Sequence, residues 1–144
     1  MIKLSIKEIE EIIKTCGLFR NKAKAIFELS FILINEHDGQ VPPSLEALKN
    51  LPGVGHKTAS VVLIQAFNIP AFPVDTHIHR LSKRWGLSNG KNVAQTEKDL
   101  KALFEKKIWA KLHLQMIYYA RKYCPAKGHN IQSCVICNST NSCK

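Results

Sequence analysis

The segment LPGVGHK, residues 51–57, decides how this chain folds. It separates a short helical pattern that Ser44 can cap from a longer helical pattern that continues to about Phe67. Gly53 and Gly55 allow a tight reversal there, because glycine adopts backbone angles that other residues avoid. The sequence therefore predicts a helix, a hairpin turn and a second helix.

The start of the second of these helices is suited to bind an anion. Its first backbone N–H groups have no partner within the helix, and the helix dipole adds partial positive charge at the same end. A phosphate group fits such a site, so the hairpin can hold a nucleic-acid backbone without reading its sequence. The plainer alternative is that the turn only connects two helices.

Helical periodicity on both sides of the hairpin predicts an all-α protein. Ser5 and Glu8 have the spacing of a capping box, and Asn21 can cap a helix that ends by Gly39. Further helices are expected at residues 6–16, 75–85, 93–104 and 108–123. No internal repeat or strand pattern is visible, and we divide the chain into a first domain of residues 1–70 and a second of residues 71–144.

The net charge of the chain favours a polyanionic partner. The 144 residues include 21 Lys and Arg against 11 Asp and Glu, a formal charge of +10. This excess favours DNA or RNA over a membrane surface, and a merely basic soluble surface is the alternative. No apolar run approaches the roughly 18 residues that a membrane-spanning helix needs. Residues 1–13 also lack the apolar core of a signal peptide, so a cytoplasmic protein is expected.

Five cysteines are present, and four of them lie close together near the end of the chain. Cys124, Cys134, Cys137 and Cys143 have the spacing C-x9-C-x2-C-x5-C. In a protein without a secretion signal, such a group more often binds metal than forms disulfides. The fifth, Cys16, lies on an apolar helical stripe and is expected in the core.

Two motifs together resemble one enzyme family. LPGVGHKTASVV, residues 51–62, and VDTHIHRL, residues 74–81, closely resemble the endonuclease III branch of the helix–hairpin–helix DNA glycosylases. The resemblance covers nearly the whole chain. It implies an all-α fold in which a helical barrel and a cluster domain flank a DNA-binding cleft. It also implies a nucleoid-associated protein whose partner is double-stranded DNA with a damaged base or an abasic site.

The resemblance further implies a catalytic pair. The family's nucleophilic lysine corresponds to Lys57, and its catalytic aspartate corresponds to Asp75. The neutral lysine amine attacks the sugar carbon that bears the damaged base and forms a Schiff base, after which β-elimination cuts the strand. Asp75 would accept protons and stabilise positive charge on the sugar. Taken alone, a helical lysine is usually a solvated charge, and an aspartate at a helix start is usually a cap.

Leu18, in the segment CGLFRN, corresponds to a family leucine that wedges into the duplex beside the extruded base. Its family partner is a glutamine in an upstream segment similar to LLSAQATD, and Met1 corresponds to a point partway into the helical barrel. We therefore expect an N-terminal truncation that leaves apolar faces exposed and calls for a partner, although the family is usually monomeric. The residues expected to contact DNA are Leu18, Leu51, Gly53, Val54, Gly55, His56 and Arg80.

The family's cysteine pattern, C-x6-C-x2-C-x5-C, holds a [4Fe–4S] cluster. In this chain the first gap is longer by three residues, within residues 125–133. We expect a [4Fe–4S] cluster on Cys124, Cys134, Cys137 and Cys143. Zinc is the alternative, because four thiolates also suit Zn²⁺.

The lysine and the cysteines together distinguish one branch of the superfamily. Family adenine glycosylases generally lack this lysine, and the oxidised-guanine glycosylases lack the cluster. The resemblance therefore implies a bifunctional DNA glycosylase and abasic-site lyase that removes oxidised pyrimidines. One alternative is a DNA-binding module without catalysis, or a fragment that needs its missing helices. The other is a structural zinc protein.

Overall fold

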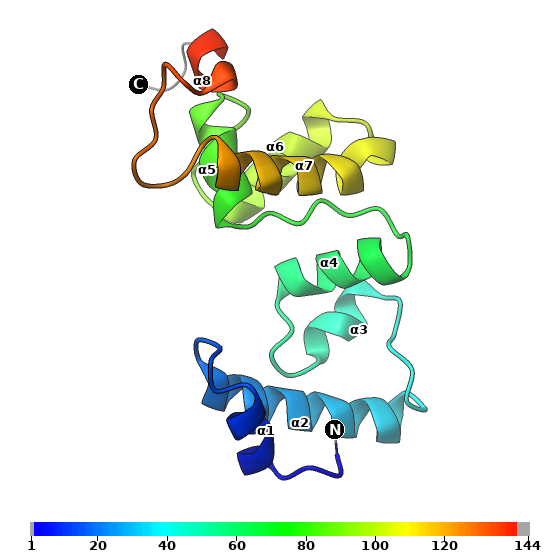
Figure 1. Ribbon diagram of the computed structural model, residues 1–144. Coiled ribbons are helices and arrows are strands. Elements are labelled where there is room, and N and C mark those ends of the chain that lie inside the picture. Colours follow the sequence, from blue (N-terminus) through cyan, green and yellow to red (C-terminus); the bar gives the residue numbers. More distant parts are fainter. Residues whose placement is uncertain (1, 141–144) are drawn as a thin grey trace. The chain divides into compact units, whose positions relative to one another are not determined.

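The computed structural model describes residues 2–140 and is shown in Figure 1. Every regular element in this range is helical, which confirms the predicted all-α fold. The elements are α1 (Ile6–Ile12), α2 (Phe19–Glu36), α3 (Leu45–Asn50), α4 (His56–Ala66), α5 (Thr76–Arg84), α6 (Val93–Leu103), the 3₁₀ helix η1 (Lys106–Ile108), α7 (Trp109–Lys122) and α8 (Val135–Thr140). None of the helices in this range is long and apolar enough to cross a membrane.

Contacts divide the chain into two compact units. The first ends at Ala59 and the second begins at Ser60. The domain limit that the sequence places after residue 70 stays a prediction.

In the first unit, α1 begins as predicted and ends early. Ser5 and Glu8 form the expected capping box, in which the Glu8 carboxylate accepts from the Ser5 backbone N–H at 2.7 Å. The prediction that this helix continues to Cys16 is wrong, and so is the prediction of a core position for Cys16, which is exposed. Only Ile9 of α1 is buried, while Ile12 is 69% exposed. The apolar stripe therefore packs on α2 over a single turn.

The start of α2 also differs from the prediction. Leu18, and not Asn21, is the N-cap, and the Leu18 backbone is left-handed with a φ of 59°. This conformation costs a residue with a side chain about 1 kcal/mol or more. Because Leu18 redirects the chain at this point, the helix begins at Phe19.

The core of the second unit lies where α5 packs against α6 and α7. Each helix contributes side chains that are almost fully buried, such as Ile78 of α5, Leu100 of α6 and Met116 of α7. The buried cluster comprises Phe72, Val74, Ile78, Leu81, Leu100, Met116, Ala120, Cys124, Cys134 and Cys137. Since three cysteines belong to it, the segment that carries Cys124, Cys134 and Cys137 is part of this core.

At the starts of two other helices, the cap is the residue that the sequence predicts. The Ser44 side chain accepts from the Ala47 backbone N–H at the start of α3, and Asp75 caps α5. The helix α8 was not expected, because residues after Pro125 have little helical periodicity. It lies inside a segment that its buried cysteines hold against the core.

Candidate functional site

The predicted hairpin lies in the first unit, between α3 and the start of α4. Gly53 has a left-handed backbone with a φ of 74°, and the Val54 N–H donates to the Leu51 carbonyl at 3.1 Å. A Cβ atom on Gly53 would lie 2.7 Å from the Cβ of Ala25 on α2. Both the backbone angle and the available space therefore require glycine at this position. Gly55, in contrast, has open space around it.

The hairpin delivers Lys57 to the first turn of α4. The His56 and Lys57 side chains are exposed. The first hydrogen bond of the helix runs from the Ala59 N–H to the Gly55 carbonyl, at 2.9 Å. The Leu51 side chain is only 5% exposed and packs in the core. Of the hairpin residues expected to contact DNA, Leu51 can therefore offer only its backbone.

Leu18 lies beside the hairpin in the same unit. Its side chain is 77% exposed. A surface pocket of about 250 Å³ is lined by Leu18, Asn21, Lys22, Ala25, Ile26, Leu29, Pro52 and Gly53. The structure thus brings two of the residues predicted from the sequence, Leu18 and Gly53, to one pocket.

Asp75 is the N-cap of α5 in the second unit. Its Oδ1 atom accepts hydrogen bonds from the backbone N–H groups of His77 and Ile78, each at 2.9 Å. Its Oδ2 atom has no hydrogen-bond partner within residues 2–140. The half-buried Asp75 carboxylate therefore caps α5 through one of its two oxygen atoms.

Arg80, predicted to contact DNA, makes its visible contacts within the protein. Its Nη2 atom donates to the Cys124 carbonyl at 3.0 Å, and its buried Nε atom has no partner within the described residues. Arg84, one turn later on α5, donates from Nη1 to Cys124 Sγ at 3.1 Å and to the Pro125 carbonyl at 2.9 Å. The two arginines tie α5 to the segment that carries the cysteines. The DNA contact of Arg80 stays a prediction.

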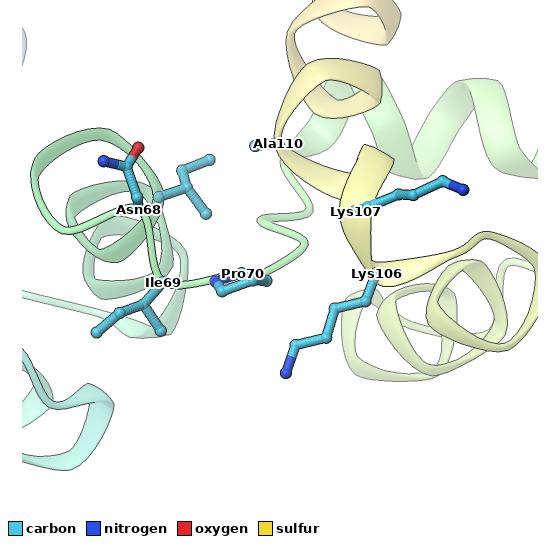
Figure 2. Close-up of a pocket in the computed structure, with 7 residues that line it drawn as sticks. Asn68, Ile69, Pro70, Lys106, Lys107 and Ala110 are labelled. Atoms are coloured by element: carbon cyan, nitrogen blue, oxygen red, sulfur yellow. The ribbon is translucent and has the colours of Figure 1, made fainter.

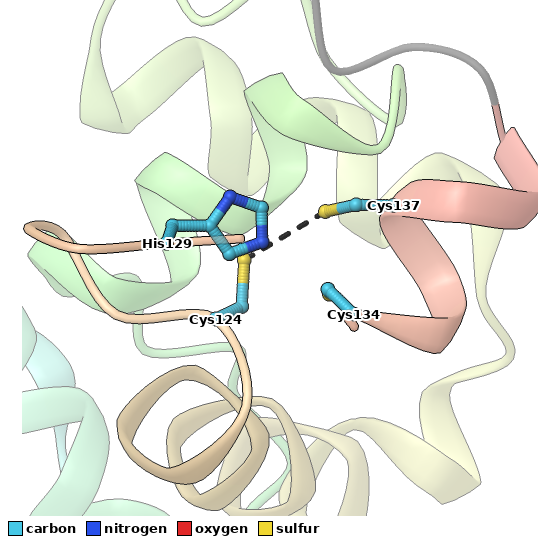
Figure 3. Close-up of side chains that lie close together, drawn as sticks. All are labelled: Cys124, His129, Cys134 and Cys137. Atoms are coloured by element: carbon cyan, nitrogen blue, oxygen red, sulfur yellow. Dashed lines mark hydrogen bonds between the residues drawn. The ribbon is translucent and has the colours of Figure 1, made fainter. Parts of the chain in front are cut away.

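Residues 124–137, here called the cysteine loop, gather a set of metal-binding side chains. The Sγ atoms of Cys124, Cys134 and Cys137 and a ring nitrogen of His129 all lie within 4.8 Å of one another. Figure 3 shows the imidazole facing the three thiols. Three thiols and an imidazole are the donor chemistry of a metal site. Cys143, the fourth predicted ligand, lies outside the described residues.

His129 is the site residue that sequence reasoning missed. The sequence prediction considered only cysteines as metal ligands, and His129 lies midway in the long first gap of the cysteine pattern. The spacing C-x4-H-x4-C-x2-C over residues 124–137 was the available signal. It mixes the two commonest zinc-ligand types at short intervals.

Two thiols of the cysteine loop have shifted proton affinities. Burial raises the pKa of the Cys124 thiol, and the Arg84 guanidinium offsets only part of that rise. For Cys134, burial also acts to raise the pKa, but the His129 imidazole, the Tyr119 hydroxyl and hydrogen bonds with Cys137 together outweigh burial, so the pKa is lowered. The Tyr119 hydroxyl lies 3.4 Å from Cys134 Sγ. Of these two thiols, Cys134 therefore becomes a thiolate more readily than Cys124.

A small cavity of about 130 Å³ lies elsewhere on the second unit (Figure 2). Its lining residues are Ile64, Asn68, Ile69, Pro70, Lys106, Lys107 and Ala110. Lys107 is paired with Glu105 at 2.6 Å. The cavity contains none of the residues predicted from the sequence, and it is not part of the candidate site.

Comparison with known proteins places the chain in a family. Residues 1–106 match the HhH-GPD superfamily of base excision DNA repair proteins. The chain is 40% identical to the endonuclease III of Bacillus subtilis over 92% of its own length, and 38% identical to that of Thermotoga maritima over 96%. The chain therefore belongs to the HhH-GPD superfamily, and it is similar to endonuclease III.

Two solved structures have the same fold. A non-covalent endonuclease III–DNA complex matches 98% of this chain with a TM-score of 0.93 and 39% identity. A trapped endonuclease III–DNA covalent intermediate matches 94% with a TM-score of 0.90 and 40% identity. The chain spans 61% of the length of the Bacillus relative and 65% of the Thermotoga relative. It is therefore shorter than the relatives that it resembles.

Proposed function

We propose that this chain carries the reacting groups of a bifunctional DNA glycosylase and abasic-site lyase of base-excision repair. Its substrate is duplex DNA that contains an oxidised pyrimidine or an abasic site. Membership of the HhH-GPD superfamily supports the repair function. Similarity to an endonuclease III trapped as a covalent DNA intermediate supports a covalent mechanism. The observation that carries the proposal is an exposed lysine in the first turn of the helix that follows the hairpin.

Lys57 is the proposed nucleophile. Its neutral Nζ attacks C1′ of the damaged nucleotide, the bond from C1′ to the base breaks, and the base leaves with the electron pair and takes up a proton. The sugar ring then opens to a Schiff base between Nζ and C1′. Loss of a proton from C2′ expels the 3′ phosphate by β-elimination and cuts the strand. Water finally hydrolyses the Schiff base and returns the free lysine.

Asp75 is the proposed proton acceptor and charge stabiliser. Its Oδ1 atom is engaged by two backbone N–H groups, which fix the carboxylate plane. Its Oδ2 atom is available to offset positive charge as the base leaves and to relay protons. A carboxylate held this way needs little reorganisation during the reaction, which favours catalysis.

DNA binding is assigned to the hairpin and to Leu18. The Gly53 turn lets the backbone approach a phosphate, and the start of α4 favours negative charge. Leu18 combines an exposed apolar side chain with a left-handed backbone, and strained residues of this kind occur at functional sites. We assign it the role of a wedge that holds the duplex open. The formal charge of +10 supports association with DNA in the nucleoid.

The cysteine loop is assigned a structural metal centre. The family resemblance implies a [4Fe–4S] cluster on Cys124, Cys134, Cys137 and Cys143, with Zn²⁺ as the alternative. As a donor type, the cysteine thiolate binds both zinc and iron–sulfur clusters. When bound, either group would keep the loop folded beside α5 and would present basic residues such as Lys127 to DNA, without entering the reaction.

Borohydride trapping tests the proposed activity. The purified chain is incubated with borohydride and a duplex that contains one abasic site, beside the variants Lys57→Ala and Lys111→Ala. Lys111 is an exposed helical lysine of α7 and serves as the matched control. We expect a covalent adduct from the unchanged chain and from Lys111→Ala, and none from Lys57→Ala. An adduct that persists in Lys57→Ala would refute the proposed nucleophile.

A DNA-binding module without catalysis is the second candidate function. It is favoured by the hairpin and the basic charge, which need no reacting group. Its signature would be salt-dependent binding to abasic duplex with no adduct and no strand cleavage by a folded, metal-loaded protein.

A further inference from the structure

The longer first gap of the cysteine pattern carries a residue that the family pattern does not contain. His129 lies midway between Cys124 and Cys134, and the cysteine loop folds back so that its ring faces the three thiols (Figure 3). All four donor atoms lie within 4.8 Å of one another. Residues 124–137 therefore contain four potential ligands without any contribution from Cys143.

The His129 ring nitrogen Nε2 is buried and makes no hydrogen bond of good geometry within the described residues, although the ring lies close enough to Cys134 to lower the pKa of that thiol. Two other histidines of the second unit have a partner for one ring nitrogen, since His79 Nδ1 lies 2.9 Å from Thr96 Oγ1 and His113 Nδ1 lies 2.8 Å from the Pro73 carbonyl. A buried nitrogen without a partner is destabilising. A metal ion among the thiols would supply the missing partner, because neutral imidazole is a common metal ligand.

The distance between the thiols indicates how many metal ions fit. Zinc–sulfur bonds of about 2.3 Å in a tetrahedron place two thiolates about 3.8 Å apart. The Cys124 and Cys137 Sγ atoms are 3.7 Å apart. In a [4Fe–4S] cluster each thiolate binds a different iron atom, so the thiolates are held further apart. The spacing in this chain fits a single ion.

The surroundings of the thiols suit an anionic centre. Three thiolates, one neutral imidazole and one Zn²⁺ ion carry a net charge of −1, which is costly to bury without compensation. Arg84 Nη1 lies 3.1 Å from Cys124 Sγ, and the Tyr119 hydroxyl lies 3.4 Å from Cys134 Sγ. Hydrogen-bond donors to the ligating atoms are the usual second layer around a bound metal.

We infer that His129 is the fourth ligand of a single tetrahedral Zn²⁺ ion that Cys124, Cys134 and Cys137 also bind, with Cys143 dispensable. The ion holds the cysteine loop and α8 against the core of the second unit. This inference does not rest on the proposed enzymatic activity. Its test needs no DNA, so the two proposals fail separately.

The first measurement is the metal content of the full chain purified without exposure to oxygen. We expect one zinc ion per chain and no stoichiometric iron or acid-labile sulfide. Four irons with matching sulfide and a broad brown absorbance would overturn the inference. Purification without oxygen matters, because a decayed cluster could leave thiols that collect zinc afterwards.

The ligand set is tested by titrating the metal-free protein with Co²⁺ as a visible probe. We expect the ligand-field absorption of a tetrahedral site with three sulfur ligands and one nitrogen. His129→Ala should weaken Co²⁺ binding by more than the roughly 10–100-fold that loss of a second-layer partner causes. Cys143→Ser is the matched control and should bind Co²⁺ as the unchanged chain does.

A third variant covers the case in which His129→Ala fails to fold. His129→Cys supplies a thiolate in the same place, so it should fold, bind Co²⁺ and shift the spectrum to that of four sulfur ligands. Unchanged Co²⁺ affinity and spectrum in His129→Ala or in His129→Cys would contradict the inference. Loss of binding in Cys143→Ser would contradict it as well.

Discussion

The hairpin of the first unit and the cysteine loop of the second unit are both proposed to bind a ligand, but they are ordered by different forces. In the hairpin the backbone is decisive, because Gly53 makes the turn and the exposed Lys57 follows on the first turn of α4. In the cysteine loop the side chains are decisive, because three fully buried cysteines and the ring of His129 converge on one point. The first should keep its shape without a ligand, whereas the second depends on one.

The difference shows which features of a site can be predicted from residues that are close together in the sequence. A glycine turn between two helical patterns is a local feature, so neighbouring residues specify it. A set of converging ligands depends on how a loop folds back in three dimensions. The predictions below test this contrast, from the largest expected effect to the smallest.

Removal of the metal should affect the two regions very differently. A structural zinc ion contributes on the order of 10 kcal/mol of apparent binding free energy in small domains, and much of this is folding free energy. A strong chelator should therefore remove hydrogen-exchange protection from residues 124–140 and leave residues 51–57 unchanged. Mass spectrometry of exchanged peptides measures both regions in one sample. Equal loss of protection in both regions would contradict the contrast.

Substitution of Asp75 should separate its cap from its chemistry. Asparagine is a good N-cap, so Asp75→Asn should leave the free energy of unfolding nearly unchanged and slow strand cleavage by roughly 10²–10⁴-fold. Asp75→Ala should slow cleavage as much and also lose about 1 kcal/mol of stability, because the hydrogen bonds from His77 and Ile78 disappear. Single-turnover cleavage and urea unfolding measure the two effects. Wild-type cleavage by Asp75→Asn would show that the carboxylate is only a cap.

Substitution of the two hairpin glycines should have unequal effects on folding. Gly53→Ala should destabilise the first unit by about 1–3 kcal/mol, because it imposes a left-handed backbone on alanine and a contact with Ala25. Gly55→Ala is the matched control and should be close to neutral, since nothing lies near its Cβ position. Urea unfolding checks both. Ala25→Gly alone should cost about 1 kcal/mol, because Ala25 lies inside α2. The double change Gly53→Ala with Ala25→Gly should cost less than the sum of the two single changes, and strictly additive costs would assign the loss at Gly53 to the backbone angle.

Substitution of Leu18 should have the smallest effect on stability. Leu18→Gly relieves the left-handed backbone but makes the unfolded chain more flexible, so the free energy of unfolding should change by less than about 1 kcal/mol. Affinity for abasic duplex should fall in Leu18→Gly and in Leu18→Ala alike, because both remove the exposed side chain. Fluorescence anisotropy measures the binding. Unchanged affinity in Leu18→Ala would remove Leu18 from the proposed DNA contacts.

Much of the fold follows from local signals in the sequence. Three helix caps can be predicted from the sequence, because each hydrogen bond spans only a few residues: the Ser5–Glu8 capping box, the Ser44 cap and the Asp75 cap. The early end of α1 cannot be predicted from the sequence, since it depends on how α1 packs against α2. The start of α2 at Phe19 depends on a left-handed backbone at Leu18, for which leucine has no preference.

The candidate site divides in the same way. The family motifs predicted the roles of Lys57 and Asp75, which remain proposals, and the cysteine spacing predicted a metal site. His129 was missed because its role depends on the path of the longer loop, which no local pattern reveals. The contacts of Arg80 and Arg84 with the cysteine loop were missed for the same reason, because they join residues about 40 positions apart along the chain.

Mass-spectrometric mapping of the borohydride-trapped adduct tests the central claim most directly. The trapped complex is digested with nuclease and protease, and the residue that carries the reduced sugar remnant is identified by fragmentation. We predict that the remnant lies on Nζ of Lys57, in the hairpin-to-helix segment. A remnant on another lysine or on the N-terminal amine would contradict the account, because the site assembled around the hairpin would then not be the site of the reaction.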